Sequence, residues 1–257
     1  MQDSISVSRD PAVRYLLRIG DLCLIHAQRL GEWCGHAPIL EEDIALGNLA
    51  LDLIGAARGV LTLAGRRGGQ SFDEDQLAFL RDERDYLNAT LVELPRGDFA
   101  CTTLRNLMVA TFLELLWLRL QDSSDAELAA IASKALKEAR YHRRHAAGWL
   151  ERLGLGTAES RRRVEAALQL LWPYAVELFT DDAVDDAAAE AALGPRCSEL
   201  RAPWHEAMDS ALAAADLAAP AQRAFVSRGR QGVHSEHMGH LLTDLQYLQR
   251  AYPGGAW

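Results

Sequence analysis

The chain has 257 residues, of which 49% are apolar and 25% charged, and its formal net charge is −9. This length and composition predict a globular domain with a large core, and the negative charge argues against binding to nucleic acid or an anionic membrane. The four cysteines, Cys23, Cys34, Cys101 and Cys197, form no C-x-x-C pair, which favours reduced thiols over disulfides or a zinc site. We therefore expect a cytoplasmic protein.

Apolar residues recur with helical periodicity along most of the sequence, and no segment alternates as a strand does, so we predict an all-α fold. Caps and prolines mark the helix starts. These signals are Asp10-Pro11, Pro38, Asp98 and the candidate capping boxes Ser71-x-x-Glu74 and Ser124-x-x-Glu127. The predicted helices cover residues 11–33, 38–64, 73–93, 99–121, 125–153, 157–179 with a kink at Pro173, a short piece of the acidic segment 180–195, 198–217 and 235–252.

Long helices joined by short breaks fold back as antiparallel neighbours, which is the architecture of a helical bundle. Residues 11–153 are predicted to form the core bundle and residues 154–257 extra helices packed on it, so that 1–257 is a single domain. Residues 1–10 have neither a basic start nor an apolar core, so we expect a disordered tail here and no signal peptide.

The most apolar stretch of the sequence runs from Ala45 to Gly65. Asp52 and Arg58 interrupt it, and charges at mid-membrane depth are costly. We therefore expect a buried helix here and no membrane span, with the carboxylate of Asp52 pointing into the bundle.

Four predicted helices each place a carboxylate among apolar side chains. These carboxylates are Asp52, Glu83, Glu114 and Glu138, and His142 lies in the apolar stripe of the same helix as Glu138. Carboxylates from four helices are the arrangement of a di-iron centre, in which oxygen ligands balance the metal charge and two histidines complete the set. The five residues therefore mark a candidate di-iron position.

This candidate position lacks the usual histidines. The expected Glu-x-x-His motifs read Glu83-x-x-Tyr86 and Glu138-x-x-Tyr141, and a phenol with an ordinary pKa of about 10 is a poor metal ligand. Lys134 lies one turn before Glu138, where its ammonium would repel a metal ion and neutralise the carboxylate. We predict a vestigial site whose carboxylates are paired with protein cations. The alternative is a competent di-iron centre with the five residues named above as ligands.

Two other motifs leave a binding function open. The segment His234 to His240 suits either a metal site at a helix start or a polar surface or subunit contact, and we favour the surface or subunit contact. The run Arg161 to Arg163 suits either the phosphates of coenzyme A or a solvated helix face, and we favour the helix face. A nucleophile at Cys34 would need a base and an oxyanion site that the sequence does not indicate, so we interpret its surroundings as a packed corner.

Several ordered motifs give the sequence a resemblance to a known family. They are LGEWCGHAP (30–38), LDLIGAAR (51–58), RDER (81–84), KEARYH (137–142) and YLQRAYPGGAW (247–257). On these motifs, which span nearly the whole chain, it resembles the C subunit of phenylacetyl-CoA epoxidase, the bacterial multicomponent monooxygenase of phenylacetate degradation.

The resemblance implies a ferritin-like fold and a structural, non-catalytic role beside a paralogous A subunit, which carries iron and epoxidises the ring of phenylacetyl-CoA with dioxygen. A small B subunit and a reductase complete the implied system. Glu83, Glu138 and His142 are then remnants of a metal site, and this subunit holds no cofactor. The sequence departs from the family pattern at Ala110, where relatives often carry an acidic residue, and Glu114 lies one turn later.

Three functions follow from these observations. A scaffold subunit would need a large apolar interface, and would be able to form a homo-oligomer when its partner is absent. A di-iron oxygenase or oxidase would need the five candidate ligands around one metal pair. A stand-alone acyl-CoA binding module would need free cations for the coenzyme A phosphates.

Overall fold

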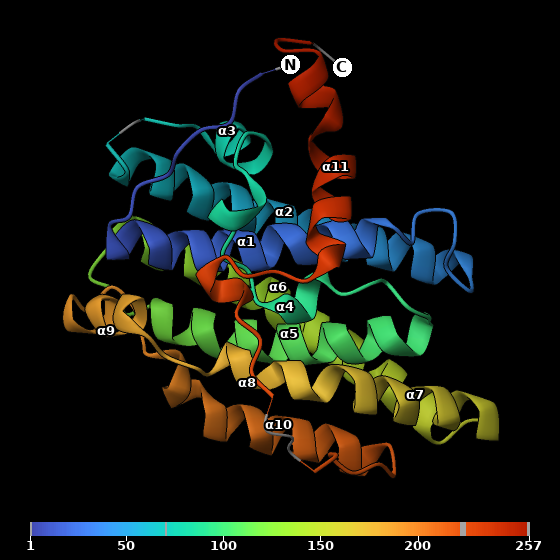
Figure 1. The fold of residues 1–257 in the computed structure, drawn as a ribbon. Helices are drawn as coiled ribbons and strands as arrows, with labels where there is room; N and C mark the ends of the chain where they lie inside the picture. The colour runs from blue at the N-terminus through green and yellow to red at the C-terminus, as the bar shows by residue number, and fades with distance from the viewer. Residues whose placement is uncertain (1, 70, 222–224, 256–257) are drawn as a thin grey trace.

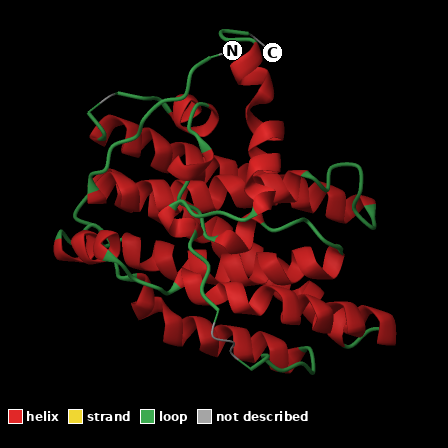
Figure 2. Ribbon diagram, viewed as in Figure 1, coloured by secondary structure: helices red, strands yellow, loops and turns green. Residues whose placement is uncertain are grey.

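The computed structural model describes residues 2–69, 71–221 and 225–255, and in these residues helix is the dominant regular structure (Figure 2). The predicted all-α fold is confirmed. The α-helices are α1 (Pro11–Gly31), α2 (Leu40–Arg67), α3 (Glu74–Phe79), α4 (Thr90–Glu93), α5 (Phe99–Leu120), α6 (Ala126–Gly154), α7 (Ala158–Leu171), α8 (Ala175–Leu178), α9 (Ala183–Glu190), α10 (Arg201–Ala214) and α11 (Glu236–Ala251). Short 3-10 helices are η1 (Glu83–Asp85), η2 (Trp172–Tyr174), η3 (Cys197–Leu200) and η4 (Gly229–Gln231).

Four long helices, α1, α2, α5 and α6, form the central bundle (Figure 1). Helix α1 packs along α2, α5 packs along α6, and α6 also contacts α2. Their inward side chains are mostly leucine and alanine, and Leu17, Leu49, Leu104 and Ala132 are completely buried. This apolar interior stabilises the bundle and gives the predicted ferritin-like arrangement.

The later helices extend the same core. Helices α7 and α10 both pack against α5 and α6. The indole of Trp204 on α10 is fully buried and donates a hydrogen bond to the Met108 carbonyl at 2.9 Å. The kink predicted at Pro173 is confirmed, because the helix ends at Leu171 and continues through η2 into α8.

The predicted helix over residues 73–93 is wrong. Only its first turns are helical, in α3, and the chain then runs through η1 and an extended stretch to the single turn of α4. Every residue from Tyr86 to Glu93 is buried, whereas a surface helix would expose one side. The Leu87 amide donates to the Asp21 carboxylate of α1 at 2.8 Å, so tertiary contacts override the helical pattern.

Helix caps follow the predictions in part. Asp10 and Asp98 accept hydrogen bonds from the first backbone amides of α1 and α5, as predicted. The two predicted capping boxes name the wrong residues. Helix α3 is capped by Asp73 with Gln76, and α6 by Asp125 alone.

Two helices, α2 and α5, are long and apolar enough to cross a membrane by length and composition alone. The most apolar window of α5 is 83% buried, which makes it a core helix. The corresponding window of α2 is only 44% buried. The buried helix predicted around Ala45–Gly65 is therefore buried on one side only, and the other side of α2 faces solvent.

Residue Gln2 lies against the C-terminal part of α11, which projects from the bundle (Figure 1). Residues 2–10 have no helix or strand. The Gln2 amide donates to the Arg250 carbonyl, and the Ile5 amide donates to the Leu80 carbonyl, both at 2.9 Å. The first residues therefore tie α11 to the loop that follows α3.

Candidate functional site

The α2–α6 seam, which we define as Asp52, Glu138 and His142, brings three of the five predicted site residues together. His142 Nε2 lies 3.1 Å from Asp52 Oδ2. All three side chains line one cavity of about 10 Å³, which is about the size of a single water molecule. Leu113 and Trp117 of α5 line the same cavity, so apolar side chains occupy its α5 side.

The electrostatics of the seam differ from the predicted ion pairs. Burial lowers the pKa of His142 although Asp52 opposes this shift, so the imidazole is neutral at neutral pH. Burial and the Asp52 charge raise the pKa of Glu138. The predicted partner, Lys134, lies 3.9 Å from Glu138 and is largely exposed. Asp52 is therefore held by a hydrogen bond from a neutral imidazole, and Glu138 by a loose surface ion pair with Lys134.

Glu114 does not join the seam. Its carboxylate accepts a hydrogen bond from Arg143 and lies 3.5 Å from Arg140, both on α6. These two guanidinium groups balance its charge outside the cavity that His142 lines. The helical spacing placed Glu114 among apolar residues correctly, but not toward the metal position.

Glu83 lies in η1, outside the central bundle, beside Gly239 of α11. The phenol of Tyr86, three residues later, is buried, donates to the Ala78 carbonyl and accepts from Gln246 at 2.9 Å. Burial raises the pKa of Tyr86 to about 12. Tyr141 is 47% exposed. Neither Glu-x-x-Tyr motif therefore supplies a phenol to the seam.

Helices α1 and α5 contribute two interior polar residues that sequence reasoning missed, His26 and Asn106. His26 Nε2 lies 3.2 Å from Asn106 Oδ1, and both side chains are buried. Burial lowers the pKa of His26 to about 3, and the nearby charge of Arg105 acts in the same direction. The available signal was a histidine inside the apolar stripe of the first predicted helix, next to Ile25 and Leu22.

A carboxylate-bridged di-iron centre needs a glutamate from each of two helices and a Glu-x-x-His motif from each of two others. Among the described residues, the seam cavity is lined by two carboxylates and one imidazole. Of the two remaining predicted ligands, Glu114 is paired with arginines and Glu83 lies outside the bundle. The donor set and the cavity volume do not fit two metal ions.

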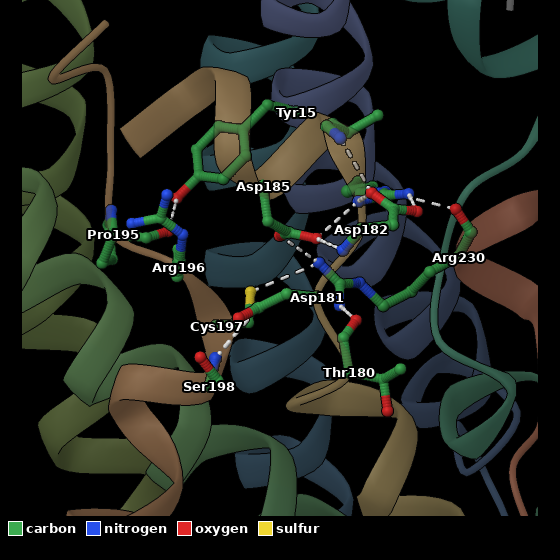
Figure 3. Close-up of polar contacts among 12 residues, drawn as sticks. Tyr15, Thr180, Asp181, Asp182, Asp185, Pro195, Arg196, Cys197, Ser198 and Arg230 are labelled. Carbon is green, nitrogen blue, oxygen red and sulfur yellow. Dashed lines mark hydrogen bonds and ion pairs between the residues drawn. The ribbon is translucent and has the colours of Figure 1, made fainter. Parts of the chain in front are cut away.

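A second group with metal-ligand chemistry is Asp181, Asp185 and Cys197, whose ligand atoms lie within 4.8 Å of one another. Figure 3 shows the guanidinium of Arg230 reaching into this group. It donates to Asp185 at 2.6 Å and contacts the Cys197 sulfur at 3.3 Å, while Arg18 binds Asp185 from the other side at 2.9 Å. Two protein cations thus take the position of a metal.

The histidine segment that begins at His234 is used for packing. His234 Nδ1 lies 2.6 Å from the Glu93 carboxylate, and Nε2 lies 2.9 Å from the Tyr86 carbonyl. A carbonyl only accepts, so with an ionised Glu93 both nitrogens must donate, and the ring is an imidazolium. Burial lowers its pKa, but the hydrogen bond and charge of Glu93 outweigh burial and raise the pKa overall.

Replacing His234 with glutamine is expected to cost about 2 kcal/mol of stability at pH 6, because a buried charge-assisted hydrogen bond is lost. The raised pKa makes this contribution fully present below the unfolded value of about 6.5 and lost as pH rises through the folded value. Urea unfolding between pH 6 and 9 should therefore show that the difference in unfolding free energy between wild type and His234→Gln becomes smaller as pH rises. A difference that grows with pH would contradict the imidazolium. The matched control is His237→Gln.

The arginine run on α7 is neutralised within the chain. Arg162 and Arg163 bind Glu159, and Arg161 binds Glu165 and Asp216. These pairs leave no concentrated positive charge for coenzyme A phosphates. The favoured interpretation, a solvated helix face, is therefore supported.

Two comparisons relate the sequence of this chain to known proteins. The sequence model of the family described as phenylacetic acid catabolic protein, which is named for PaaA and PaaC, matches residues 1–257. The chain is 47% identical over 243 residues to the C subunit of 1,2-phenylacetyl-CoA epoxidase from Escherichia coli (strain K12), an alignment that covers 95% of this chain and 98% of the relative. The chain therefore belongs to the family of phenylacetic acid catabolic proteins.

Proposed function

We propose that this chain is the scaffold subunit of a multicomponent phenylacetyl-CoA epoxidase and performs no chemistry itself. Its relative bears the name of the C subunit of such an epoxidase, and the family is named for two kinds of chain. In this proposal the paralogous A subunit holds the iron and the substrate, while a B subunit and a reductase complete the system. The C-type chain holds the A subunit in its working geometry.

The donor set of the α2–α6 seam carries this proposal. Two carboxylates and the neutral His142 do not make a di-iron ligand set, and Trp117 occupies part of the space. Glu114, which would complete a third helix, is bound by two arginines. These observations favour a scaffold over the alternative of a di-iron oxygenase, and the paired arginines of α7 disfavour a stand-alone acyl-CoA binding module.

Reconstitution tests the proposal. Epoxidation of phenylacetyl-CoA by the A subunit, B subunit and reductase is expected to require this chain, and the chain purified alone is expected to contain far less than one iron. His142→Gln should keep the rate within about twofold, because the glutamine amide still donates to Asp52 and no reacting group is lost. A catalytic seam would lose its imidazole ligand and at least about a hundredfold in rate.

Two further outcomes would contradict the scaffold role. Two bound irons per lone chain would place the metal centre here. Calorimetric titration of the lone chain with phenylacetyl-CoA is expected to show no binding, and saturable binding would favour the acyl-CoA module.

A further inference from the structure

The solvent side of α2 carries a row of exposed apolar side chains over its first four turns. Leu40, Ile44 and Leu51 are 72%, 57% and 65% exposed and are spaced so that they share one side of the helix. This side carries no charged residue between Ile44 and Gly55 except Asp52, which lies at the seam with α6. Contiguous exposed apolar surface of this kind marks an interaction site.

Two glycines, Gly47 and Gly55, lie on the same side of α2. A Cβ atom added at either position would meet no atom of the described residues within 4 Å. Glycine inside a helix costs about 1 kcal/mol relative to alanine, and no contact within the chain requires it here. Small residues permit a second helix to approach closely. Among the described residues, no atom would contact a side chain at either glycine.

On α6, Tyr141 lies beside the seam residue His142 and is 47% exposed. Between the two helices lie Asp52 and Glu138, whose side chains are 38% and 25% exposed. His142 is neutral, and Lys134 lies at 3.9 Å from Glu138. The edge of the apolar surface is therefore acidic, and Lys134 pairs with it only loosely from the solvent side.

We propose that the α2–α6 face, defined as Leu40, Ile44, Leu51 and Tyr141 together with Asp52 and Glu138, is the docking surface for a helical subunit of the same family. An apolar helix of that subunit packs over Gly47 and Gly55 of α2. A lysine or arginine of the same subunit reaches the seam and pairs with the two carboxylates. This inference rests on the proposed function and names the surface through which it operates.

The acidic seam favours a different subunit of the family over a second copy of this chain and over a membrane surface. In a twofold pair of identical chains, both partners would bring the same acidic seam to one interface, which repels. A membrane would desolvate Asp52 and Glu138 without offering a partner, and its anionic headgroups would repel a chain of net charge −9. A different subunit of the same fold is free to carry a complementary cation.

The test measures binding of the full chain to its A-type subunit by calorimetry, using wild type, the double variant Ile44→Arg/Leu51→Arg, and Leu170→Arg. Leu170 is an exposed leucine on α7 and serves as the matched control. The double variant is expected to raise the Kd at least a hundredfold, while Leu170→Arg leaves it unchanged. Circular dichroism and urea midpoints should stay at the wild-type values, because the replaced side chains are exposed.

A second variant, Asp52→Asn/Glu138→Gln, keeps the apolar surface and removes its charge. It is expected to raise the Kd about tenfold at low salt, with a smaller effect at high salt. No change would overturn the cation contact.

The remaining outcomes separate this inference from the proposed function. Equal binding by wild type and the Ile44→Arg/Leu51→Arg variant overturns the surface but keeps the scaffold role. A wild-type chain that fails to bind the A-type subunit overturns the scaffold role itself. Two other results would also overturn the proposal, provided that the double variant still binds the A-type subunit as wild type does. If wild type forms a homodimer that the double variant does not form, the face binds a second copy of the chain. If wild type floats with lipid vesicles and the double variant does not, the face binds lipid.

Discussion

Replacing Asp21 with alanine is expected to lower the free energy of unfolding of the free chain by roughly 3–5 kcal/mol, because it leaves a buried guanidinium without its counter-charge. Asp21 and Arg81 are both completely buried and form two contacts, one of them at 3.0 Å. Asp21 also accepts the Leu87 amide at 2.8 Å. One carboxylate therefore fixes both the cation and the extended segment that replaces the predicted helix over residues 73–93.

Urea unfolding measures this loss of free energy. The double variant Asp21→Leu/Arg81→Met shows how much of the loss comes from leaving Arg81 without its partner. Removing both charges together is expected to cost clearly less than Asp21→Ala, since no unpaired charge remains in the core. The matched control is Glu127→Ala, which breaks the exposed pair with Arg66 and should cost at most about 1 kcal/mol. Equal losses for the buried and exposed pairs would refute the argument.

Local signals in the sequence predicted the parts of the fold that depend on local physics. Asp10, Pro11 and Asp98 identified helix starts because capping requires only neighbouring residues. Pro173 identified the break after α7 for the same reason. The segment around Tyr86 failed because its conformation depends on Asp21 and Arg81, which approach only after the chain has folded.

The same distinction between local and tertiary effects applies to the candidate site. Asp52, Glu138 and His142 share a cavity because α2 and α6 are continuous helices whose periodicity the sequence shows. Glu83 was misplaced because its helix does not exist, which also concealed that α1 is the fourth helix of the bundle. With α1 in that position, His26 becomes an interior residue of the central bundle.

The side on which a partner binds was also not predictable from periodicity. The sequence predicted burial of the whole Ala45–Gly65 stretch because its residues are apolar nearly all around the helix. The structure covers one side with α1 and α6 and leaves the other exposed. An apolar helix of this kind looks the same in sequence whether its second partner is the same chain or another subunit.

His26 is expected to make the protein sensitive to acid. Its pKa is lowered by burial to about 3, whereas in the unfolded chain it is about 6.5. Between these values the unfolded state binds more protons than the folded state, so stability falls as pH falls. The contribution is fully present well above pH 6.5, and at pH 4.5 about 2.7 kcal/mol of it has been lost.

Replacing His26 with glutamine tests this directly, because the amide still donates to Asn106 but binds no proton. At neutral pH the variant should lose about 1 kcal/mol from imperfect packing. Between pH 8 and 4.5 wild type should lose about 2.7 kcal/mol more than the variant, so that the variant becomes the more stable protein at pH 4.5. The control is the exposed His36→Gln, which should follow wild type, and parallel acid losses in wild type and His26→Gln would show that the buried imidazole does not limit stability.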